Sequence, residues 1–246
     1  MFEDVRRVSI ELSNLCNYSA LHKYCPANFN TKKTILSIYV IKDLIGELKE
    51  DNWGTAFEDT ILVYHIYNEP LIDPRLFWLI DYASKELPIV KQRIMTNGWY
   101  LNENILRELI DFGIDKVTFT IYNRKEKERI LKIARKYKDK TDIHLAKFYR
   151  DFVETDRIPN EKDYRKCYAP LCDLNIRASG NVGLCCVDYK ETVVFGNLYD
   201  ETLKQIFEKQ YEEMKKIQSD LIEKKRTLDV CKNCFRRRTS HGIRGR

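Results

Sequence analysis

The chain has 246 residues, a formal net charge of +6 and a hydrophobic fraction of 43%. This length can bury a sizeable core, as one large domain or as one domain with a small module. No apolar run approaches the roughly 20 residues that a membrane-spanning helix needs, and no apolar segment follows the first residues as in a signal peptide. We therefore expect a cytoplasmic protein without a membrane partner.

Basic residues are concentrated near the end of the chain. Nine Lys or Arg and one Asp lie between residues 224 and 246, so the rest of the chain is close to neutral. A nucleic-acid-binding protein more often carries its basic residues along one face of the main domain, and we expect no nucleic-acid partner. In a reducing compartment, the eight cysteines favour metal binding over disulfides.

Strand and helix signals alternate along the first 150 residues. Apolar and β-branched runs predict five strands, at residues 5–12, 60–66, 89–95, 116–121 and 143–148. Apolar residues at helical spacing predict four helices between them, which begin near Ser37, Asp73-Pro74, Asn102 and Lys125. This order is typical of a parallel sheet with crossover helices.

Polar residues follow each of the predicted strands. They are Cys16, Asn68-Glu69, Thr96-Asn97, Tyr122-Asn123 and Arg150-Asp151. Parallel α/β proteins bind their ligands at the carboxyl ends of the strands. We therefore expect these five segments to converge on one face.

Cys16, His22 and Cys25 lie within ten residues, directly after the first predicted strand. Thiolates and imidazoles are ligands of zinc and of iron–sulfur clusters. The residues around them, Glu-Leu-Ser-Asn-Leu before Cys16 and Tyr-Cys-Pro at residues 24–26, resemble the cluster loop of the radical S-adenosylmethionine (SAM) enzymes. In that family, three cysteines spaced CxxxCxxC hold three irons of a 4Fe–4S cluster, and SAM chelates the fourth iron.

The loop departs from the family spacing. Its outer cysteines are two residues further apart than CxxxCxxC allows, and no cysteine lies between them. Aligned from the C-terminal end, the missing ligand falls on His22, and imidazole is an iron ligand in some clusters. One interpretation makes His22 the third ligand. In the other, His22 is a loop residue and the third position is held by water, by another group or by nothing.

Further segments are similar to motifs of the same family. Asn68-Glu69-Pro70-Leu71 stands where the family usually carries Gly-Gly-Glu-Pro-Leu, with Tyr67 and Asn68 in place of the glycines. The resemblance implies that Asn68 and Glu69 meet the amino group of SAM, a charge-assisted contact. Thr96-Asn97-Gly98 is similar to the family's Thr-Asn-Gly segment. The other cofactor contacts that the resemblance implies come from Tyr24, at the adenine, and from Thr96, Asn97 and Thr120.

Arg150 follows the predicted fifth strand and is a candidate catalytic residue. A planar guanidinium suits the SAM carboxylate or a polar substrate. A surface arginine is the alternative interpretation.

From residue 154 the sequence becomes polar, and we place a domain boundary there, with a radical SAM domain at 1–153 and a smaller module at 154–246. The module contains a hairpin turning at Gly180, a Gly-Asn-Leu segment before an amphipathic helix, and a late CxxC. This order resembles the auxiliary-cluster module called SPASM, in its shorter form, twitch. The resemblance implies a second 4Fe–4S cluster on Cys167, Cys185, Cys231 and Cys234.

Two points in the module stay open. A CxxC pair also occurs in zinc sites, although the two earlier thiols do not form a second CxxC. Cys172 and Cys186 are left without an assigned role.

The resemblance implies an α/β fold, a partial (β/α)6 TIM-like barrel followed by a small α+β twitch module. It also implies an enzyme that reductively cleaves SAM to a 5′-deoxyadenosyl radical, which abstracts hydrogen from a small polar substrate. Among the possible reactions, we favour the net oxidation of a sugar- or aminocyclitol-like alcohol, with the auxiliary cluster as electron acceptor. A flavodoxin- or ferredoxin-type protein would supply the electrons.

Other functions remain open at this point. A thiol that returns a hydrogen atom would make the enzyme a radical epimerase, and many SPASM proteins mature ribosomal peptides. Because one family cysteine is missing, a degenerate iron–sulfur scaffold or an electron carrier is the non-enzyme alternative. Formation of 5′-deoxyadenosine from SAM separates an enzyme from a scaffold.

Overall fold

The computed structural model describes residues 1–19, 25–28, 32–122, 124–145, 166–232 and 234. Over these residues the strands are β1 (Arg7–Ile10), β2 (Ile61–Val63), β3 (Lys91–Thr96), β4 (Lys116–Ile121), β5 (Thr141–Leu145), β6 (Asp173–Ile176), β7 (Asn181–Gly183) and β8 (Val194–Asn197). The α-helices are α1 (Ile38–Glu50), α2 (Leu76–Glu86), α3 (Glu103–Asp111), α4 (Arg124–Ala134), α5 (Leu203–Ile222) and α6 (Asp229–Lys232). Short 3-10 helices are η2 (Pro26–Asn28), η3 (Pro70–Ile72) and η4 (Arg135–Tyr137).

A single sheet contains all of these strands, in the order β5-β4-β3-β2-β1-β6-β7-β8. The six strands from β5 through β1 to β6 are parallel, and β7 and β8 run antiparallel to their neighbours. The predicted α/β fold with a parallel sheet is therefore confirmed. The sixth parallel strand of the sheet, β6, lies beside β1 and comes from the C-terminal segment. The predicted domain boundary at residues 153 and 154 lies outside the described residues and stays a prediction.

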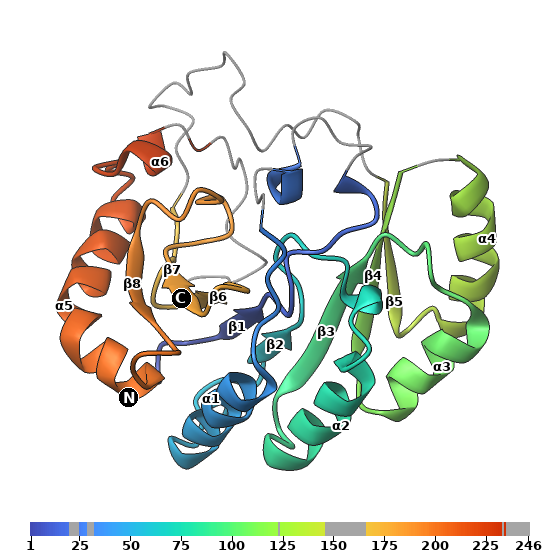
Figure 1. Ribbon diagram of the computed structural model, residues 1–246, viewed down its shortest axis with the longest axis horizontal. Helices are drawn as coiled ribbons and strands as arrows, with labels where there is room; N and C mark the ends of the chain where they lie inside the picture. The colour runs from blue at the N-terminus through green and yellow to red at the C-terminus, as the bar shows by residue number, and fades with distance from the viewer. Residues whose placement is uncertain (20–24, 29–31, 123, 146–165, 233, 235–246) are drawn as a thin grey trace.

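The helices form an arc around the sheet in Figure 1, with α5, α1, α2, α3 and α4 following one another from left to right. Parallel neighbours need crossover connections, and α1 to α4 provide them between β1 and β5. Two of the predicted helix starts have the expected caps. Ser37 accepts the N–H of Tyr39 at 3.3 Å, and Asn102 accepts the N–H of Ile105 at 2.9 Å.

Helix α2 begins at Leu76, after the start that Asp73-Pro74 predicts. The Asp73 side chain accepts the backbone N–H of Arg75 at 3.0 Å, and this turn comes before the first helical residue. The Arg75 guanidinium then donates to the carbonyls of Leu12 and Leu36, at 3.1 and 2.6 Å. The turn before α2 is therefore tied to the chain that follows β1.

One hydrophobic cluster runs through the described chain from Phe2 to Cys231. The rings of Phe2 and Phe207 pack edge to face, with their centroids 4.9 Å apart. The buried face of α5 belongs to the same cluster and consists of Leu203, Ile206, Phe207, Met214, Ile217 and Leu221. The parallel sheet and the C-terminal segment therefore share one core.

The hairpin between β6 and β7 turns at Gly180, as predicted. Gly180 has a φ of +85°, and a Cβ atom there would lie 2.5 Å from Cδ2 of Tyr199. Only glycine meets both conditions without strain. The hairpin directs the chain from β6 back through β7 to Cys185 and Cys186.

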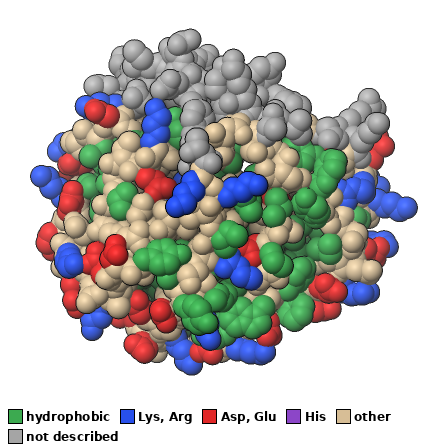
Figure 2. Space-filling view, viewed as in Figure 1, with side chains coloured by type: hydrophobic (Ala, Val, Ile, Leu, Met, Phe, Trp, Pro, Cys, Tyr) green, Lys and Arg blue, Asp and Glu red, His purple; other side chains and the backbone are tan. Residues whose placement is uncertain are grey.

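The face shown in Figure 2 agrees with the near-neutral charge of most of the chain. On this face, acidic and basic side chains are interspersed around hydrophobic ones. None of the helices in the described ranges combines the length and the apolar character that crossing a lipid bilayer requires.

Glu47 joins α1 to the start of α5. Its two carboxylate oxygens accept the backbone N–H groups of Leu203 and Lys204, at 3.1 and 2.8 Å. Thr202 and Gln205 close a capping box at the same helix end. A carboxylate at a helix N-terminus receives otherwise unpaired donors and interacts favourably with the helix dipole.

We predict that Glu47→Ala lowers the free energy of unfolding by about 1.5–3 kcal/mol, because two charge-assisted hydrogen bonds are lost. Glu50→Ala is the control, since Glu50 is exposed on the same helix and its replacement removes the same charge. Chemical unfolding of both variants measures the difference. Equal stabilities of the two variants would contradict the role of Glu47 in holding α5 against α1.

Candidate SAM and iron–sulfur site

Cys16 and Cys25 lie beyond the carboxyl end of β1, and both thiols are half-buried. The pKa of Cys16 is raised to about 11, mainly by burial and to a lesser extent by the charges of Cys25 and Glu69. Backbone N–H groups of Tyr18 and Ser19 hydrogen-bond to the Cys16 sulfur and act in the opposite direction. Burial also raises the pKa of Cys25, and the backbone of Ala27 hydrogen-bonds to its sulfur.

This environment suits metal-bound thiolates. Two close, buried thiols resist ionisation unless a cation sits between them, and a bound metal deprotonates a coordinating thiol outright. Backbone donors aimed at the sulfur atoms are also the contacts that tune an iron–sulfur cluster. The residues present at this end of the sheet therefore fit an iron–sulfur cluster.

Three of the predicted site residues lie outside the described residues. They are His22, Tyr24 and Arg150. Their predicted roles stay predictions.

Glu69 connects the ends of β2 and β3 and is 2% exposed. Its carboxylate accepts the hydroxyl of Thr96 at 2.6 Å, the backbone N–H of Asn97 at 2.7 Å and that of Leu71 at 3.1 Å. Burial raises the pKa of Glu69, and these three hydrogen bonds lower it. An ionised carboxylate offers about four lone-pair positions, so one acceptor position remains beside these three.

The cluster loop is tied to the same place. The Asn97 side chain donates to the side-chain oxygen of Asn17 at 2.8 Å, and Asn17 directly follows Cys16. The backbone N–H of Glu69 donates to the carbonyl of Leu15 at 2.8 Å, on the other side of Cys16. The structure thus brings the predicted residues Cys16, Glu69, Thr96 and Asn97 together.

Asn68 and Thr120 are placed differently. The Asn68 side chain accepts the N–H of Ile66 at 3.1 Å and donates to the carbonyl of Tyr64 at 3.3 Å, so it shapes the turn after β2. Thr120 is half-buried near the end of β4. Direct contacts of either residue with a cofactor stay predictions.

An aromatic group that sequence reasoning did not assign stands beside the thiols. Tyr18 stacks on Tyr122 with ring centroids 5.1 Å apart, and Trp99 packs edge-on against Tyr18 at 5.9 Å. The Tyr18 hydroxyl donates to Glu126 on α4. Burial raises the pKa of Tyr122, and the charges of Cys16, Cys25 and Glu69 add to the effect. Tyr122 is therefore close to both thiols and to Glu69.

The four C-terminal cysteines that the sequence assigns to a second cluster are brought together. Burial raises the pKa of Cys231 to about 12, and the charges of Cys234 and Cys167 contribute. Burial raises the pKa of Cys185 well above its usual value, and Cys234 again contributes. The N–H of Val187 donates to the Cys185 sulfur at 3.4 Å.

These thiols have the same character as the N-terminal pair, being partly or fully buried and close to one another. Within the described residues, no three His, Cys, Asp or Glu side chains are close enough to hold a single metal ion. A four-iron cluster is larger than one ion and needs its ligands further apart. The donor set, thiols with backbone N–H groups at sulfur, fits such a cluster.

Cys172 lies elsewhere, between Gln218 and the start of the chain. Gln218 donates to its sulfur at 3.2 Å, and burial raises its pKa, with Asp4 and Arg6 among its charged neighbours.

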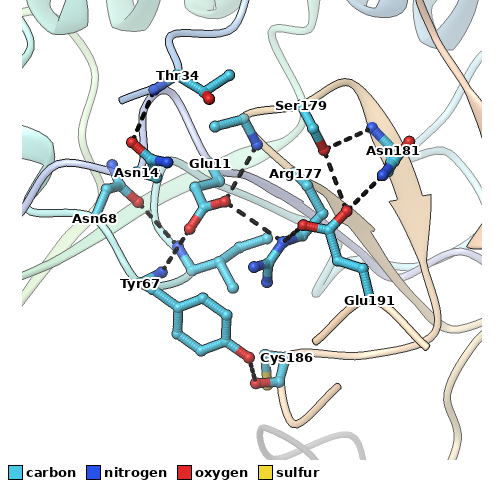
Figure 3. A network of polar contacts seen from close by, with 12 residues as sticks. Glu11, Asn14, Thr34, Tyr67, Asn68, Arg177, Ser179, Asn181, Cys186 and Glu191 are labelled. Atoms are coloured by element: carbon cyan, nitrogen blue, oxygen red, sulfur yellow. Dashed lines mark hydrogen bonds and ion pairs between the residues drawn. The ribbon is translucent and has the colours of Figure 1, made fainter. Parts of the chain in front are cut away.

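A polar network joins the end of β1 and the turn after β2 to the C-terminal segment, and Figure 3 shows it from close by. Glu11, at the end of β1, accepts the N–H groups of Tyr67 and Ala178 at 3.3 and 3.2 Å. The Arg177 Nε atom lies 3.4 Å from a carboxylate oxygen of Glu11 and 3.4 Å from one of Glu191. Its guanidinium carbon lies 4.4 Å from the centre of the Tyr67 ring.

Sequence reasoning did not single out this network. Glu11 interrupts an apolar run, and Tyr67 stands where the family usually has glycine. Glu11 and Tyr67 therefore each indicated a buried polar contact. The local sequence pattern does not identify Arg177 as their partner.

Comparison with known proteins agrees with this geometry. Residues 167–235 match SPASM, described as an iron–sulfur cluster-binding domain. The chain is 24% identical over 245 residues to an S-adenosyl-L-methionine-dependent 2-deoxy-scyllo-inosamine dehydrogenase of Niallia circulans, covering 92% of this chain and 91% of that protein. It is also 26% identical over 163 residues to an uncharacterized protein of Methanocaldococcus jannaschii, covering 63% of this chain and 49% of that protein.

Solved structures show the same fold. BtrN in complex with AdoMet and 2-DOIA superposes with a TM-score of 0.78 at 22% identity, over 94% of this chain and 92% of that chain. Native anSMEcpe with bound AdoMet and a peptide superposes with a TM-score of 0.61 at 16% identity, over 93% of this chain and 85% of that chain. The predicted resemblance, a radical SAM fold with a C-terminal SPASM module, is confirmed.

We predict that Thr96→Val lowers the free energy of unfolding at neutral pH by about 1.5–3 kcal/mol, the range for a hydrogen bond to a charged group. The Thr96 hydroxyl lowers the pKa of Glu69, so its removal raises the pKa of this carboxyl in the folded protein. The destabilisation is therefore largest where Glu69 is ionised and shrinks as the pH falls through that raised pKa.

Denaturant unfolding at several pH values checks this prediction. Thr118→Val is the control, because Thr118 lies on the neighbouring strand β4, is half-buried, and undergoes the same change of side chain. A pH-independent loss in Thr96→Val, or an equal loss in the control, would refute the assigned hydrogen bond.

Proposed function

We propose that the protein is a radical SAM dehydrogenase that oxidises an alcohol of a small polar substrate, similar to an aminocyclitol. The observation that carries the proposal is the pair of buried thiol groups, one beside Glu69 at the carboxyl ends of β1 to β3 and one in the segment that matches SPASM. The relative from Niallia circulans, named for a SAM-dependent dehydrogenase reaction, supports the choice of reaction.

Two clusters have separate roles in this proposal. Cys16 and Cys25, with His22 as third ligand, hold the SAM-binding 4Fe–4S cluster, and the auxiliary cluster is held by Cys167, Cys185, Cys231 and Cys234. When bound, the first cluster supplies the electron that splits SAM into methionine and a 5′-deoxyadenosyl radical, and the second takes up an electron from the substrate.

The chain's own residues position the cofactor and exclude water. Glu69 is held by three donors on one side and has an acceptor position left for the ammonium group of SAM. Asn97 fixes the loop beside Cys16 through Asn17. The stacked rings of Tyr18 and Tyr122 lie beside the thiols and would help to keep water from a bound cofactor, and a water-poor site protects a radical from side reactions.

Oxidation of an alcohol to a ketone removes two hydrogen atoms. One leaves as a hydrogen atom to the 5′-deoxyadenosyl group, and the other leaves as a proton and an electron. The auxiliary cluster, when bound, would accept that electron, so atoms and electrons balance. Arg150 is the proposed contact to the SAM carboxylate or to the substrate, and a flavodoxin- or ferredoxin-type protein is the proposed electron donor.

We predict that protein reconstituted anaerobically with iron and sulfide holds about eight irons and, once reduced, converts SAM to 5′-deoxyadenosine. Cys16→Ala combined with Cys25→Ala should leave about four irons and no 5′-deoxyadenosine, because only the first cluster is lost. Cys172→Ala, a thiol outside both groups, should keep about eight irons.

Iron and sulfide analysis and chromatography of the SAM products measure these outcomes. Unsubstituted protein that binds iron but makes no 5′-deoxyadenosine would favour the scaffold or electron carrier. A substrate product of inverted configuration, without net oxidation, would favour the epimerase.

The role of His22 is tested separately. Replacing a thiolate ligand by a neutral imidazole removes negative charge from the cluster and raises its reduction potential, as in Rieske centres. We therefore predict that His22→Cys retains the first cluster and lowers its potential. We also predict that His22→Ala loses this cluster or its SAM cleavage while the auxiliary cluster remains. Parent rates of 5′-deoxyadenosine formation in His22→Ala would show that another group holds the third iron.

A further inference from the structure

Tyr67 reaches from the turn after β2 to the segment that follows β7. Its hydroxyl donates to the backbone carbonyl of Cys186, as Figure 3 shows. Cys186 directly follows Cys185, one of the four proposed ligands of the auxiliary cluster. Tyr67 itself lies two residues before Glu69. The side chain therefore joins the proposed SAM site to the proposed auxiliary-cluster site.

The carbonyl that accepts this hydrogen bond belongs to the peptide group between Cys186 and Val187. The N–H of the same peptide group donates to the sulfur of Cys185 at 3.4 Å. Two hydrogen bonds thus run in series, from the Tyr67 hydroxyl through one peptide group to a sulfur atom. Hydrogen bonds in a chain polarise one another, because a donor at the carbonyl makes the N–H of that peptide a stronger donor.

Arg177 holds the ring of Tyr67 in place by packing against its face. The Arg177 side chain is 1% exposed and is itself fixed by Glu11 and Glu191. Glu191 is in turn bound by Ser179 at 3.2 Å and by the Asn181 side chain at 2.5 Å. Burial raises the pKa of Tyr67 well above its usual value, so the hydroxyl keeps its proton across the neutral range.

We propose that Tyr67 is a positioning residue that raises the reduction potential of the auxiliary cluster through the Cys186–Val187 peptide group. The inference rests on the proposed function, since it needs a cluster on Cys185. Reduction adds a negative charge to a cluster, and N–H donors at its sulfur atoms stabilise that charge. Tyr67 strengthens one such donor and thereby favours transfer of an electron from the substrate to this cluster.

The test compares variants that differ by one hydroxyl group. Tyr67→Phe keeps the ring over Arg177 and removes the hydroxyl, and with it the hydrogen bond to Cys186 and the polar contact of the hydroxyl with Arg177. Tyr64→Phe is the matched control, because Tyr64 also follows β2 and is fully buried, but its hydroxyl donates to Gln92 in the core. Both variants are made in the Cys16→Ala, Cys25→Ala background, where the auxiliary cluster alone gives a signal.

Redox titration of the reconstituted proteins, followed by electron paramagnetic resonance, measures the midpoint potential. We expect Tyr67→Phe to shift it downward, so that the ratio of reduced to oxidised cluster at a fixed potential falls several-fold. Tyr64→Phe should leave it unchanged. Replacing Tyr67 by 3-fluorotyrosine, a stronger donor of the same shape, should shift it upward and provides a second variant if Tyr67→Phe does not fold.

The outcomes separate the inference from the proposed function. An intact auxiliary cluster whose potential is the same in the parent, Tyr67→Phe and 3-fluorotyrosine proteins would overturn the role of Tyr67 alone. Equal downward shifts in Tyr67→Phe and Tyr64→Phe would also overturn it, because they would reflect general loosening. A background protein that binds no cluster at all would overturn the proposed function, and this inference with it.

Discussion

The buried ion pair between Glu11 and Arg177 is the contact on which the site depends. The side chains are 2% and 1% exposed, and they come from the ends of β1 and β6, two parallel neighbours far apart in the sequence. Removing one partner of such a pair typically costs about 3–5 kcal/mol, because the other charge is left buried. The pair therefore favours a single register of β6 beside β1.

That register determines the position of the loops above it. Glu11 also accepts the N–H of Tyr67, so the turn that leads to Glu69 is placed relative to β1. From Glu69, hydrogen bonds continue through Asn97 to Asn17 and the cluster loop. The residues of the proposed SAM site are thus fixed by a continuous series of polar contacts that begins at one buried carboxylate.

Much of this arrangement could be predicted from the sequence because it depends on local signals. Ser37 and Asn102 are helix caps that act within one turn, and Gly180 is required by the backbone of its own hairpin. The strand ends that carry Cys16, Glu69 and Thr96 follow from the alternation of strands and helices. The predicted start of the fifth strand was less accurate. Thr141 enters β5 before the predicted start, and its hydroxyl donates to the carbonyls of Ala134 and Tyr137, which pattern alone does not show.

The contacts that sequence could not supply are long-range. Glu11 and Arg177, Glu47 and the start of α5, and Tyr67 and Cys186 are each separated by more than a hundred residues. No local periodicity specifies such a pair, since each residue also fits an exposed position. The pairing of β6 with β1 could not be predicted either, because it is also a contact between distant parts of the sequence. It depends on which edge of the sheet is free when the C-terminal segment folds.

The position of β6 has a consequence for the independence of the first half of the chain. Without the C-terminal segment, β1 would become an outer strand with unpaired backbone groups, although its four residues are all buried in the full protein. An exposed apolar strand edge is a template for pairing with other chains. The N-terminal segment with the SAM-binding residues is therefore half of a folding unit, and on its own it would associate with itself before it could act as a free-standing enzyme.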